Sequence, residues 1–179
     1  MGVEIEKKYR LTKEQRERVL LRLRAVGAEF CGEEFEENTL YGGGIINLRN
    51  SVLRLRRVGG RAVLTYKERF PSESSIKHQR EDETVVEDAE AMAAILEALG
   101  YSPALVYEKR RATWRVNEVE VVLDELPFGS FMEIEGAEQA ILAAEKLLEL
   151  EELEAEMQSY PQLTRQHGRK VGEMIEARF

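Results

Sequence analysis

The stretch VEIEKKYR, residues 3–10, decides how the rest of the chain is interpreted. In a β-strand, successive side chains point to opposite faces. One face would then carry Val3, Ile5, Lys7 and Tyr9, and the other would carry Glu4, Glu6, Lys8 and Arg10. The second face holds two carboxylates followed by two cations. Such a face can be the solvated side of an edge strand, but the same pattern returns in most of the later strand candidates.

Later segments also place like charges on one face and apolar residues on the other. Acids recur as Glu-x-Glu and bases as Arg-x-Arg or Lys-x-Arg, whereas exposed strands usually mix the two signs. Gly59-Gly60 predicts a hairpin turn between two of these segments. The predicted strands after the first are residues 51–58, 61–67, 76–87, 105–116, 119–123, which leads to Asp124, and 131–136.

Helical periodicity predicts four helices between and after these strands. The first begins at Thr12, which with Gln15 forms a capping-box pattern, and it ends at Gly27. The others are predicted at 89–99, 137–150 and 160–168. Residues 29–42 are harder to assign: 38–41 predict a short strand end, and the glycines at 42–44 predict a loop. A loop around Pro71 is interpreted as an exposed connection, with a lid as the alternative.

Length and composition favour one domain, residues 1–179, with a sizeable core. The net charge of −8 argues against bulk binding to nucleic acid or to an anionic membrane, although it leaves room for a local basic pocket. The lone Cys31, expected to be packed, cannot form an intramolecular disulfide and indicates a reducing compartment. No apolar run is long enough to span a membrane, so a cytoplasmic protein is expected.

The predicted fold is α+β: a single antiparallel barrel of about eight strands with the helices packed outside. Alternation fixes which residues share a face but not which face points inward. If the apolar faces pack against the helices, the charged faces line the interior. That interior set is Glu4, Glu6, Lys8, Arg54, Arg56, Lys67, Glu81, Glu83, Lys109, Arg111, Asp124, Glu133 and Glu135.

The chemistry of this set favours the inward orientation. Buried charges are costly unless each is paired or meets a ligand. Carboxylate clusters bind hard divalent cations such as Mg²⁺ or Mn²⁺. Arginine and lysine clusters bind phosphate, arginine often in bidentate geometry. A cavity with both kinds of cluster would suit a polyphosphate together with its metal ions.

The sequence resembles a known family, the CYTH superfamily, whose members are also called triphosphate tunnel metalloenzymes. Glu4-x-Glu6-x-Lys8 resembles the ExExK signature of that family. The resemblance continues in order along the chain through Leu53-Arg54-Leu55-Arg56, Thr65-Tyr66-Lys67, Glu81-Asp82-Glu83, Lys109-Arg110-Arg111, Asp124 and Phe131-Met132-Glu133-Ile134-Glu135. It implies an eight-stranded antiparallel barrel forming a tunnel with inward-pointing charges.

The resemblance also implies a role for each charged residue. Arg54, Arg56, Lys67, Lys109 and Arg111 would hold the triphosphate, with Lys8 as a substrate-binding and catalytic residue near the reacting end. Glu4, Glu6, Asp124, Glu133 and Glu135 would hold Mg²⁺ or Mn²⁺, with two ions expected. Glu81 and Glu83 would line the tunnel as catalytic residues, either as metal ligands or as water-positioning groups.

Two departures from the family pattern are expected to lie outside the charged core and to affect substrate choice more than catalysis. One is the segment 38–41, which lacks an aspartate that many members carry, and the other is Glu68-Arg69 in place of glycine-proline.

Family members hydrolyse inorganic triphosphate, thiamine triphosphate or other triphosphates, or cyclise ATP to cyclic AMP. The main hypothesis is a metal-dependent hydrolase of inorganic triphosphate. The alternatives are a class IV adenylyl cyclase and a non-catalytic polyphosphate or nucleotide sensor. No adenine pocket can be located, and Trp114, on the face opposite Lys109 and Arg111, is expected to pack under a helix. A homodimer is compatible with the sequence.

Overall fold

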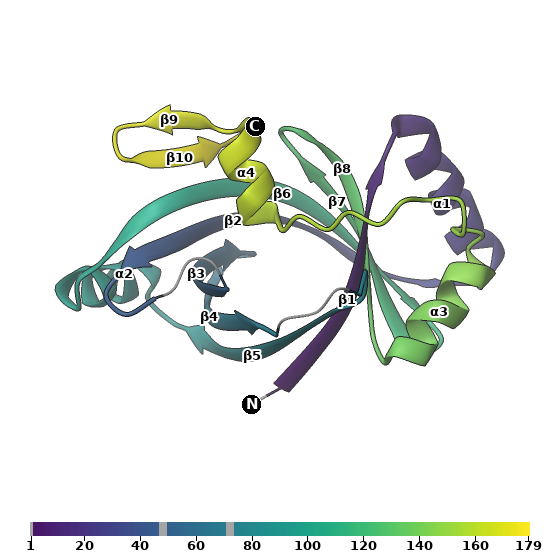
Figure 1. Ribbon diagram of the computed structural model, residues 1–179, viewed down its shortest axis with the longest axis horizontal. Coiled ribbons are helices and arrows are strands. Elements are labelled where there is room, and N and C mark those ends of the chain that lie inside the picture. The colour runs from purple at the N-terminus through teal and green to yellow at the C-terminus, as the bar shows by residue number, and fades with distance from the viewer. Residues whose placement is uncertain (1, 47–49, 71–73) are drawn as a thin grey trace.

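Eight antiparallel strands close into a barrel in the computed structural model, which describes residues 2–46, 50–70 and 74–179 (Figure 1). Around the barrel the order is β2-β3-β4-β5-β1-β8-β7-β6, and β6 pairs back with β2 to close the ring. The strands are β1 (Gly2–Leu11), β2 (Glu29–Gly43), β3 (Ser51–Val58), β4 (Arg61–Arg69), β5 (Lys77–Val86), β6 (Tyr101–Val116), β7 (Val119–Leu126) and β8 (Gly129–Glu135). The predicted fold class is confirmed.

β1 joins the two halves of the barrel. Its first half pairs with β5, where Glu4 faces Gln79 across the ladder, and its second half pairs with β8, where Lys8 faces Glu133. Because residues paired in register share a face, the charged face of β1 meets charged or polar residues on both neighbours. β1, with its alternating charges at residues 3–10, therefore supplies one wall of the interior.

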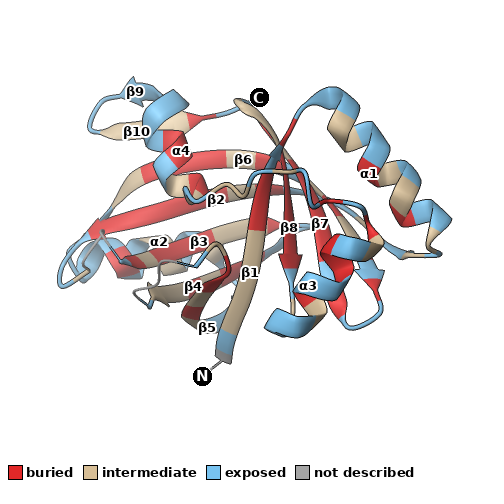
Figure 2. Ribbon diagram, turned by 45° about the vertical axis from the view of Figure 1, so that its right-hand side comes forward, coloured by how far each residue is buried: buried red, intermediate tan, exposed pale blue. Residues whose placement is uncertain are grey.

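The helices cover the outside of the barrel and decide which face of each strand points inward. α1 (Lys13–Ala25) and α3 (Glu138–Leu147) pack on the apolar faces of β1, β7 and β8 (Figure 2), whereas α2 (Ala89–Ala98) packs against β3 and β6. Burying one Leu-sized side chain contributes about 1.5–3 kcal/mol. The outer cluster includes Tyr9, Leu23, Val121, Met132 and Ile134, all fully buried. The apolar faces thus point outward, and the charged faces must point inward.

The first helix forms as its sequence predicts. Thr12 caps α1, its hydroxyl accepting from the Gln15 N–H, while the Gln15 side chain accepts from the Thr12 N–H. Trp114 is buried in the outer cluster, as expected for a residue under a helix, and its ring packs against the tilted ring of Phe30 with the two centroids 4.9 Å apart.

The end of the chain contains the helix predicted at residues 160–168 and two strands that periodicity did not predict. α4 (Tyr160–His167) lies across one side of the barrel, and β9 (Arg169–Val171) and β10 (Met174–Ala177) follow it as a small hairpin. β10 pairs in parallel with residues 105–107 of β6. That part of β6 precedes the section paired with β7, so its edge is open to a further strand.

Two predictions for residues 29–44 were wrong: the strand is longer than its predicted end at 38–41, and Cys31 is not packed. β2 is a 15-residue strand paired with β6 along almost its whole length, and it includes Gly42 and Gly43. Gly43 has a φ of +97°, and a Cβ there would lie 2.6 Å from the Gly100 carbonyl oxygen, so a close backbone approach explains this glycine. Cys31, near the start of β2, is exposed rather than packed.

Two other sequence interpretations concern the loops and the membrane. The exposed loop or lid predicted around Pro71 includes residues 71–73, which lie outside the described residues. Within the described part of the chain, none of the helices combines the length and apolarity that crossing a membrane requires.

Candidate active site

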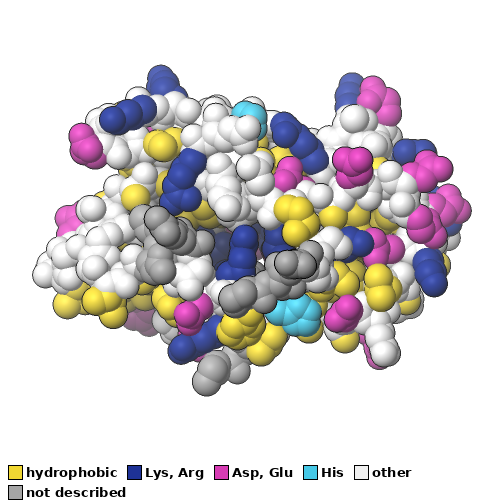
Figure 3. Space-filling view, in the orientation of Figure 1, with side chains coloured by type: hydrophobic (Ala, Val, Ile, Leu, Met, Phe, Trp, Pro, Cys, Tyr) yellow, Lys and Arg dark blue, Asp and Glu magenta, His cyan; other side chains and the backbone are white. Residues whose placement is uncertain are grey.

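A cavity of about 320 Å³ runs inside the barrel and is lined by residues from all eight barrel strands and the start of α4. Figure 3 shows Lys and Arg side chains inside a hollow in the middle of one face. All but one of the charged residues predicted to point inward line this cavity, and the exception is Asp124. Its charged lining residues are Glu4, Glu6, Lys8, Arg54, Arg56, Lys67, Arg69, Glu81, Glu83, Lys109, Arg111, Glu120, Glu133, Glu135 and Arg165.

Asp124 lies behind the cavity wall as the shared acceptor of two cations. Arg111 donates to it through Nε at 2.8 Å and Nη2 at 2.6 Å, and Lys109 Nζ lies at 3.2 Å. Tyr160 of α4 donates its hydroxyl to the same carboxylate at 2.8 Å. Asp124 is fully buried. Asp124 therefore fixes two predicted phosphate-binding residues, and a metal ion would have to replace these partners to bind it.

Lys8 and Glu133 form a second buried pair next to this one. Lys8 Nζ lies 3.1 Å from Glu133 and 3.9 Å from the centre of the Tyr160 ring. Arg111 Nη2 also donates to Glu133 at 2.7 Å. Burial alone would raise the pKa of Glu133, but Lys8 and Arg111 lower it well below its ordinary value. Glu133 is therefore ionised and holds the Lys8 ammonium inside the cavity.

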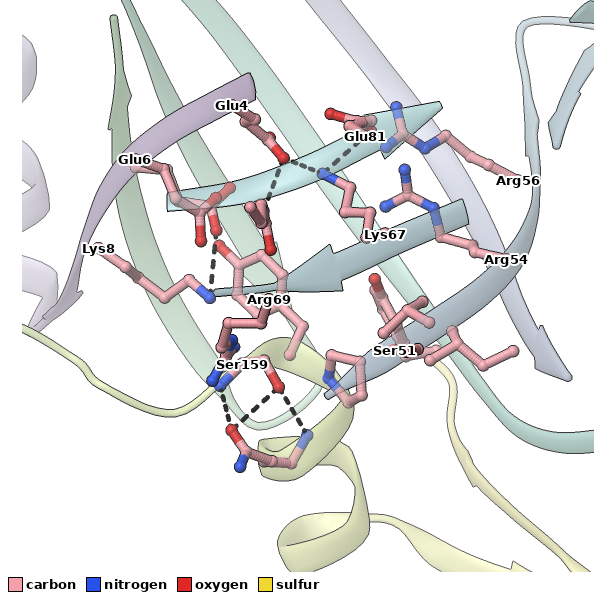
Figure 4. A pocket seen from close by; sticks show the side chains of 18 of the residues that line it. Glu4, Glu6, Lys8, Ser51, Arg54, Arg56, Lys67, Arg69, Glu81 and Ser159 are labelled. Atoms are coloured by element: carbon pink, nitrogen blue, oxygen red, sulfur yellow. Dashed lines mark hydrogen bonds and ion pairs between the residues drawn. The ribbon is translucent and has the colours of Figure 1, made fainter. Parts of the chain in front are cut away.

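Carboxylates gather around Lys67 in another part of the cavity (Figure 4). Lys67 Nζ contacts Glu4 and lies 3.1 Å from Glu81, and Gln79 donates to Glu4 at 2.6 Å. Burial and the neighbouring Glu4 raise the pKa of Glu135 to about 7, against the effect of Lys67. Carboxylates are thus crowded enough to repel one another here.

This crowding fits a divalent cation. Oxygen donors from several carboxylates are the ligands that Mg²⁺ and Mn²⁺ prefer, and an ion would relieve the repulsion that raises the pKa of Glu135. In the structure Lys67 stands between Glu4 and Glu81. Within residues 2–46, 50–70 and 74–179, no three His, Cys, Asp or Glu side chains are already arranged as a metal site. Lys67 would accordingly compete with a metal ion for Glu4 and Glu81.

Glu83 and Glu6 complete the predicted acidic set. Glu83, 44% exposed at its side chain, accepts from Thr65 at 3.0 Å and lies 3.9 Å from Arg54. Glu6 lies 3.5 Å from Lys77 of β5. Burial, together with the nearby Lys8, lowers the pKa of Lys77 to about 8.

Lys77 is an interior cation that was not predicted. The predicted inward face of β5 began at Glu81, and the same alternation continued back along the strand passes through Gln79 to Lys77. Tyr160 was also missed, because a single tyrosine at the start of a helix carries no signal of what it contacts.

Residue Glu36 of β2 is the most prominent omission. It is 1% exposed and lies among Arg56, Lys109 and Arg111, with its carboxylate oxygens 3.5, 3.4 and 3.9 Å from their nitrogens. Burial alone would raise the pKa of Glu36, but these cations lower it to about 2. The alternation Glu36, Asn38, Leu40 was present in the sequence but was obscured by the acidic run around it.

The expectation that both departures from the family pattern lie outside the charged core was wrong. Asn38 is fully buried, and its amide donates to Glu36 at 3.2 Å. Arg69 lines the cavity. Asn38 falls on the inward face through the alternation of β2, and Arg69 does so because β4 continues past the predicted end at residue 67.

A closed barrel of eight antiparallel strands around a cavity of paired acids and bases defines a charged-tunnel barrel protein. The CYTH domain family matches residues 2–164, and the chain belongs to this family.

Similar proteins agree with this assignment. A Methanocaldococcus jannaschii protein, provisionally named an adenylate cyclase, is 28% identical over 151 residues, covering 82% of this chain and 84% of that protein. The structure of a Pyrococcus horikoshii OT3 protein is similar with a TM-score of 0.78 and 26% identity, over 89% of this chain and 98% of the other.

A third similarity shows the fold alone. A Hippeastrum protein, provisionally called an adenylyl cyclase and described as having a dominant triphosphatase activity, has a TM-score of 0.71 at 21% identity. The match covers 95% of this chain and 98% of that one.

Proposed function

We propose that this protein is a divalent-metal-dependent hydrolase of a triphosphate, most simply inorganic triphosphate. The observation that carries the proposal is that one cavity holds both a cationic cluster and a carboxylate cluster. Arg54, Arg56, Lys109 and Arg111 form the first, and Glu4, Glu81 and Glu135 belong to the second. A triphosphate with its metal ions carries the two complementary charges.

The cationic cluster suits a phosphate chain by geometry as well as charge. Arg54 and Arg56 lie two residues apart on β3, so both guanidinium groups project from the same face into the cavity (Figure 4). Guanidinium groups bind phosphate oxygens in bidentate fashion, and Lys109 adds a point charge. Buried Nε atoms of Arg54 and Arg56 have no hydrogen-bond partner among the described residues. Neither Nε atom is therefore committed to a hydrogen bond with the protein, although both are buried.

We propose Glu4, Glu6, Glu133 and Glu135 as ligands for Mg²⁺ or Mn²⁺, with Asp124 if its ion pairs exchange. Such ions polarise phosphoryl oxygens and lower the pKa of bound water. Lys8, held by Glu133 and the Tyr160 ring, would offset charge that develops on the phosphoryl oxygens near the reacting end. Glu81 and Glu83 would orient a water molecule or add to the metal ligands.

The second candidate function is cyclisation of ATP. It is favoured by the provisional name of the Methanocaldococcus jannaschii relative and by apolar side chains in the cavity wall, including Leu40, Val52 and Pro161, which could contact a base. The Hippeastrum protein shows that this fold can hydrolyse a triphosphate where its name assigns cyclisation. We favour hydrolysis because most of the lining is charged.

The test is a parallel product assay. The protein would be supplied with inorganic triphosphate, thiamine triphosphate or ATP, with Mg²⁺ or Mn²⁺, and both phosphate and cyclic AMP would be measured. Fast phosphate release from inorganic triphosphate, with little from ATP, supports the proposal. Formation of cyclic AMP from ATP would instead identify the protein as an adenylyl cyclase. Binding of these compounds without any product would identify it as a non-catalytic polyphosphate or nucleotide sensor.

Two variants connect that activity to the cavity. Arg54→Ala should weaken triphosphate binding, because it removes a buried guanidinium group from the wall. Arg61→Ala is the matched control, since Arg61 is 61% exposed at its side chain and pairs only at the surface with Glu34. Equal loss of binding in both variants would show that the cavity is not the site.

A further inference from the structure

Glu36 places a negative charge in the middle of the cationic cluster. Its Oε2 lies 3.5 Å from Arg56 Nε and 3.4 Å from Lys109 Nζ, and its Oε1 lies 3.9 Å from Arg111 Nε. The Asn38 amide donates to the same carboxylate at 3.2 Å. These cations are the residues proposed to hold the phosphate chain. Glu36 therefore already satisfies part of the charge that a phosphate group would satisfy.

The cation contacts of Glu36 are looser than those of Asp124, which shares Lys109 and Arg111 with it. Asp124 accepts two bonds from Arg111 at 2.8 and 2.6 Å, whereas the three cation contacts of Glu36 range from 3.4 to 3.9 Å. Arg56 Nε forms no hydrogen bond within the described structure. Asp124 thus fixes the cations in position, and Glu36 neutralises them without using all of their donors.

Its position makes Glu36 a competitor of any bound anion. Burial opposes ionisation of this carboxyl group, but the neighbouring cations lower its pKa to about 2 and keep it ionised at neutral pH. A phosphate that approaches Arg56 and Lys109 meets this fixed like charge, and because Glu36 is buried, bulk solvent screens the Coulomb repulsion less than it would at the surface. A triphosphate can offset the repulsion by reaching Lys8 and Lys67 elsewhere in the cavity. A shorter phosphate confined to the cationic cluster cannot.

We propose that Glu36 is a specificity-determining residue that acts as an internal competing anion: it lowers the affinity of the cationic cluster for short phosphates, and so favours triphosphate binding and product release. This inference rests on the proposed function. It assigns to Glu36 a role in binding, not in the chemical step.

The experiment is isothermal titration calorimetry with pyrophosphate and with tripolyphosphate. A chelator is present, so that no metal contributes and no hydrolysis occurs. The proteins compared are wild type, Glu36→Gln and Glu34→Gln. Glu34 is the matched control because it lies on the same strand but is exposed and pairs at the surface with Arg61.

We expect Glu36→Gln to bind pyrophosphate about tenfold more tightly or better, since removing one nearby like charge is worth at least one pKa unit of interaction. The gain for tripolyphosphate should be smaller, and Glu34→Gln should match wild type. Equal or weaker pyrophosphate binding by Glu36→Gln would overturn the inference and make Glu36 a purely structural partner of the cations.

A second variant tests the inference by adding negative charge, so that the affinity for pyrophosphate should fall instead of rise. Asn38→Asp adds a carboxylate beside Glu36, so pyrophosphate binding should weaken about tenfold. Unchanged binding in Asn38→Asp would also count against the inference. If wild type and all variants failed to bind tripolyphosphate with the chelator and again with Mg²⁺ in its place, the proposed function itself would be overturned. Tight wild-type binding without the Glu36 effect would overturn the inference alone.

Discussion

Replacing Asp124 by asparagine should destabilise the protein strongly, even in the absence of metal. The substitution keeps the shape of the side chain but removes its charge and turns one acceptor oxygen into a donor. In the structure that carboxylate accepts from Arg111 at 2.8 and 2.6 Å, from Lys109 at 3.2 Å and from Tyr160 at 2.8 Å. The asparagine amide would face at least one of these donors without an acceptor.

The size of the effect follows from the burial of the group. Asp124 is fully buried and Lys109 is 2% exposed, so the cations left behind cannot recover their hydration. Breaking a buried ion pair by removing one partner costs about 3–5 kcal/mol. Glu133 and Glu36 still contact Arg111, which places the expected loss at the lower end, about 3 kcal/mol. For a chain of this length that corresponds to a fall in Tm of about 6–12 °C.

The assay is urea unfolding with a chelator present, compared with Glu125→Gln. Glu125 is the next residue of β7 but points outward, where it pairs with Arg110 at 3.5 Å on the surface. Its replacement should change the free energy of unfolding by less than about 0.5 kcal/mol. A loss below about 1 kcal/mol in Asp124→Asn would refute the reasoning. If the substitution instead abolished only stabilisation by Mn²⁺, Asp124 would act chiefly as a metal ligand.

Three further predictions concern other parts of the molecule. Tyr9→Phe removes the hydroxyl that donates to Glu145, so the free energy of unfolding in urea should fall by about 1–2 kcal/mol, and an unchanged value would contradict the assigned bond. The folded-state pKa of Glu36, about 2, is below its ordinary value of 4.5, so its contribution to stability is present above pH 4.5 and is lost as the pH falls toward 2. Urea unfolding at a series of pH values should show a shallower decline in Glu36→Gln, and identical slopes would exclude this contribution. Mn²⁺ should raise the Tm of wild type, and raise it less in Glu135→Gln, because the ion relieves carboxylate crowding; equal shifts would remove Glu135 from the metal ligands.

Much of the fold and of the site could be predicted because both depend on strict alternation. The period of two fixed Glu4, Glu6 and Lys8 on one face, and the same count fixed Arg54 with Arg56 and Lys109 with Arg111. These residues do line one cavity. Prediction failed where the alternation was hidden or interrupted. The acidic run from Glu33 to Glu37 concealed the inward position of Glu36, and the glycines at 42–44 concealed the continuation of β2.

The sequence by itself determined which residues share a face, where most helices and hairpins lie, and that the faces separate charged from apolar side chains. These are local properties, set by backbone geometry and by the chemistry of each residue. Only the tertiary structure decided the partners across the barrel. Asp124 is joined to Tyr160 of α4, and Lys67 stands between Glu4 of β1 and Glu81 of β5. Ion pairing and desolvation depend on distances between residues far apart in the chain, which are fixed when the eight strands close around one cavity.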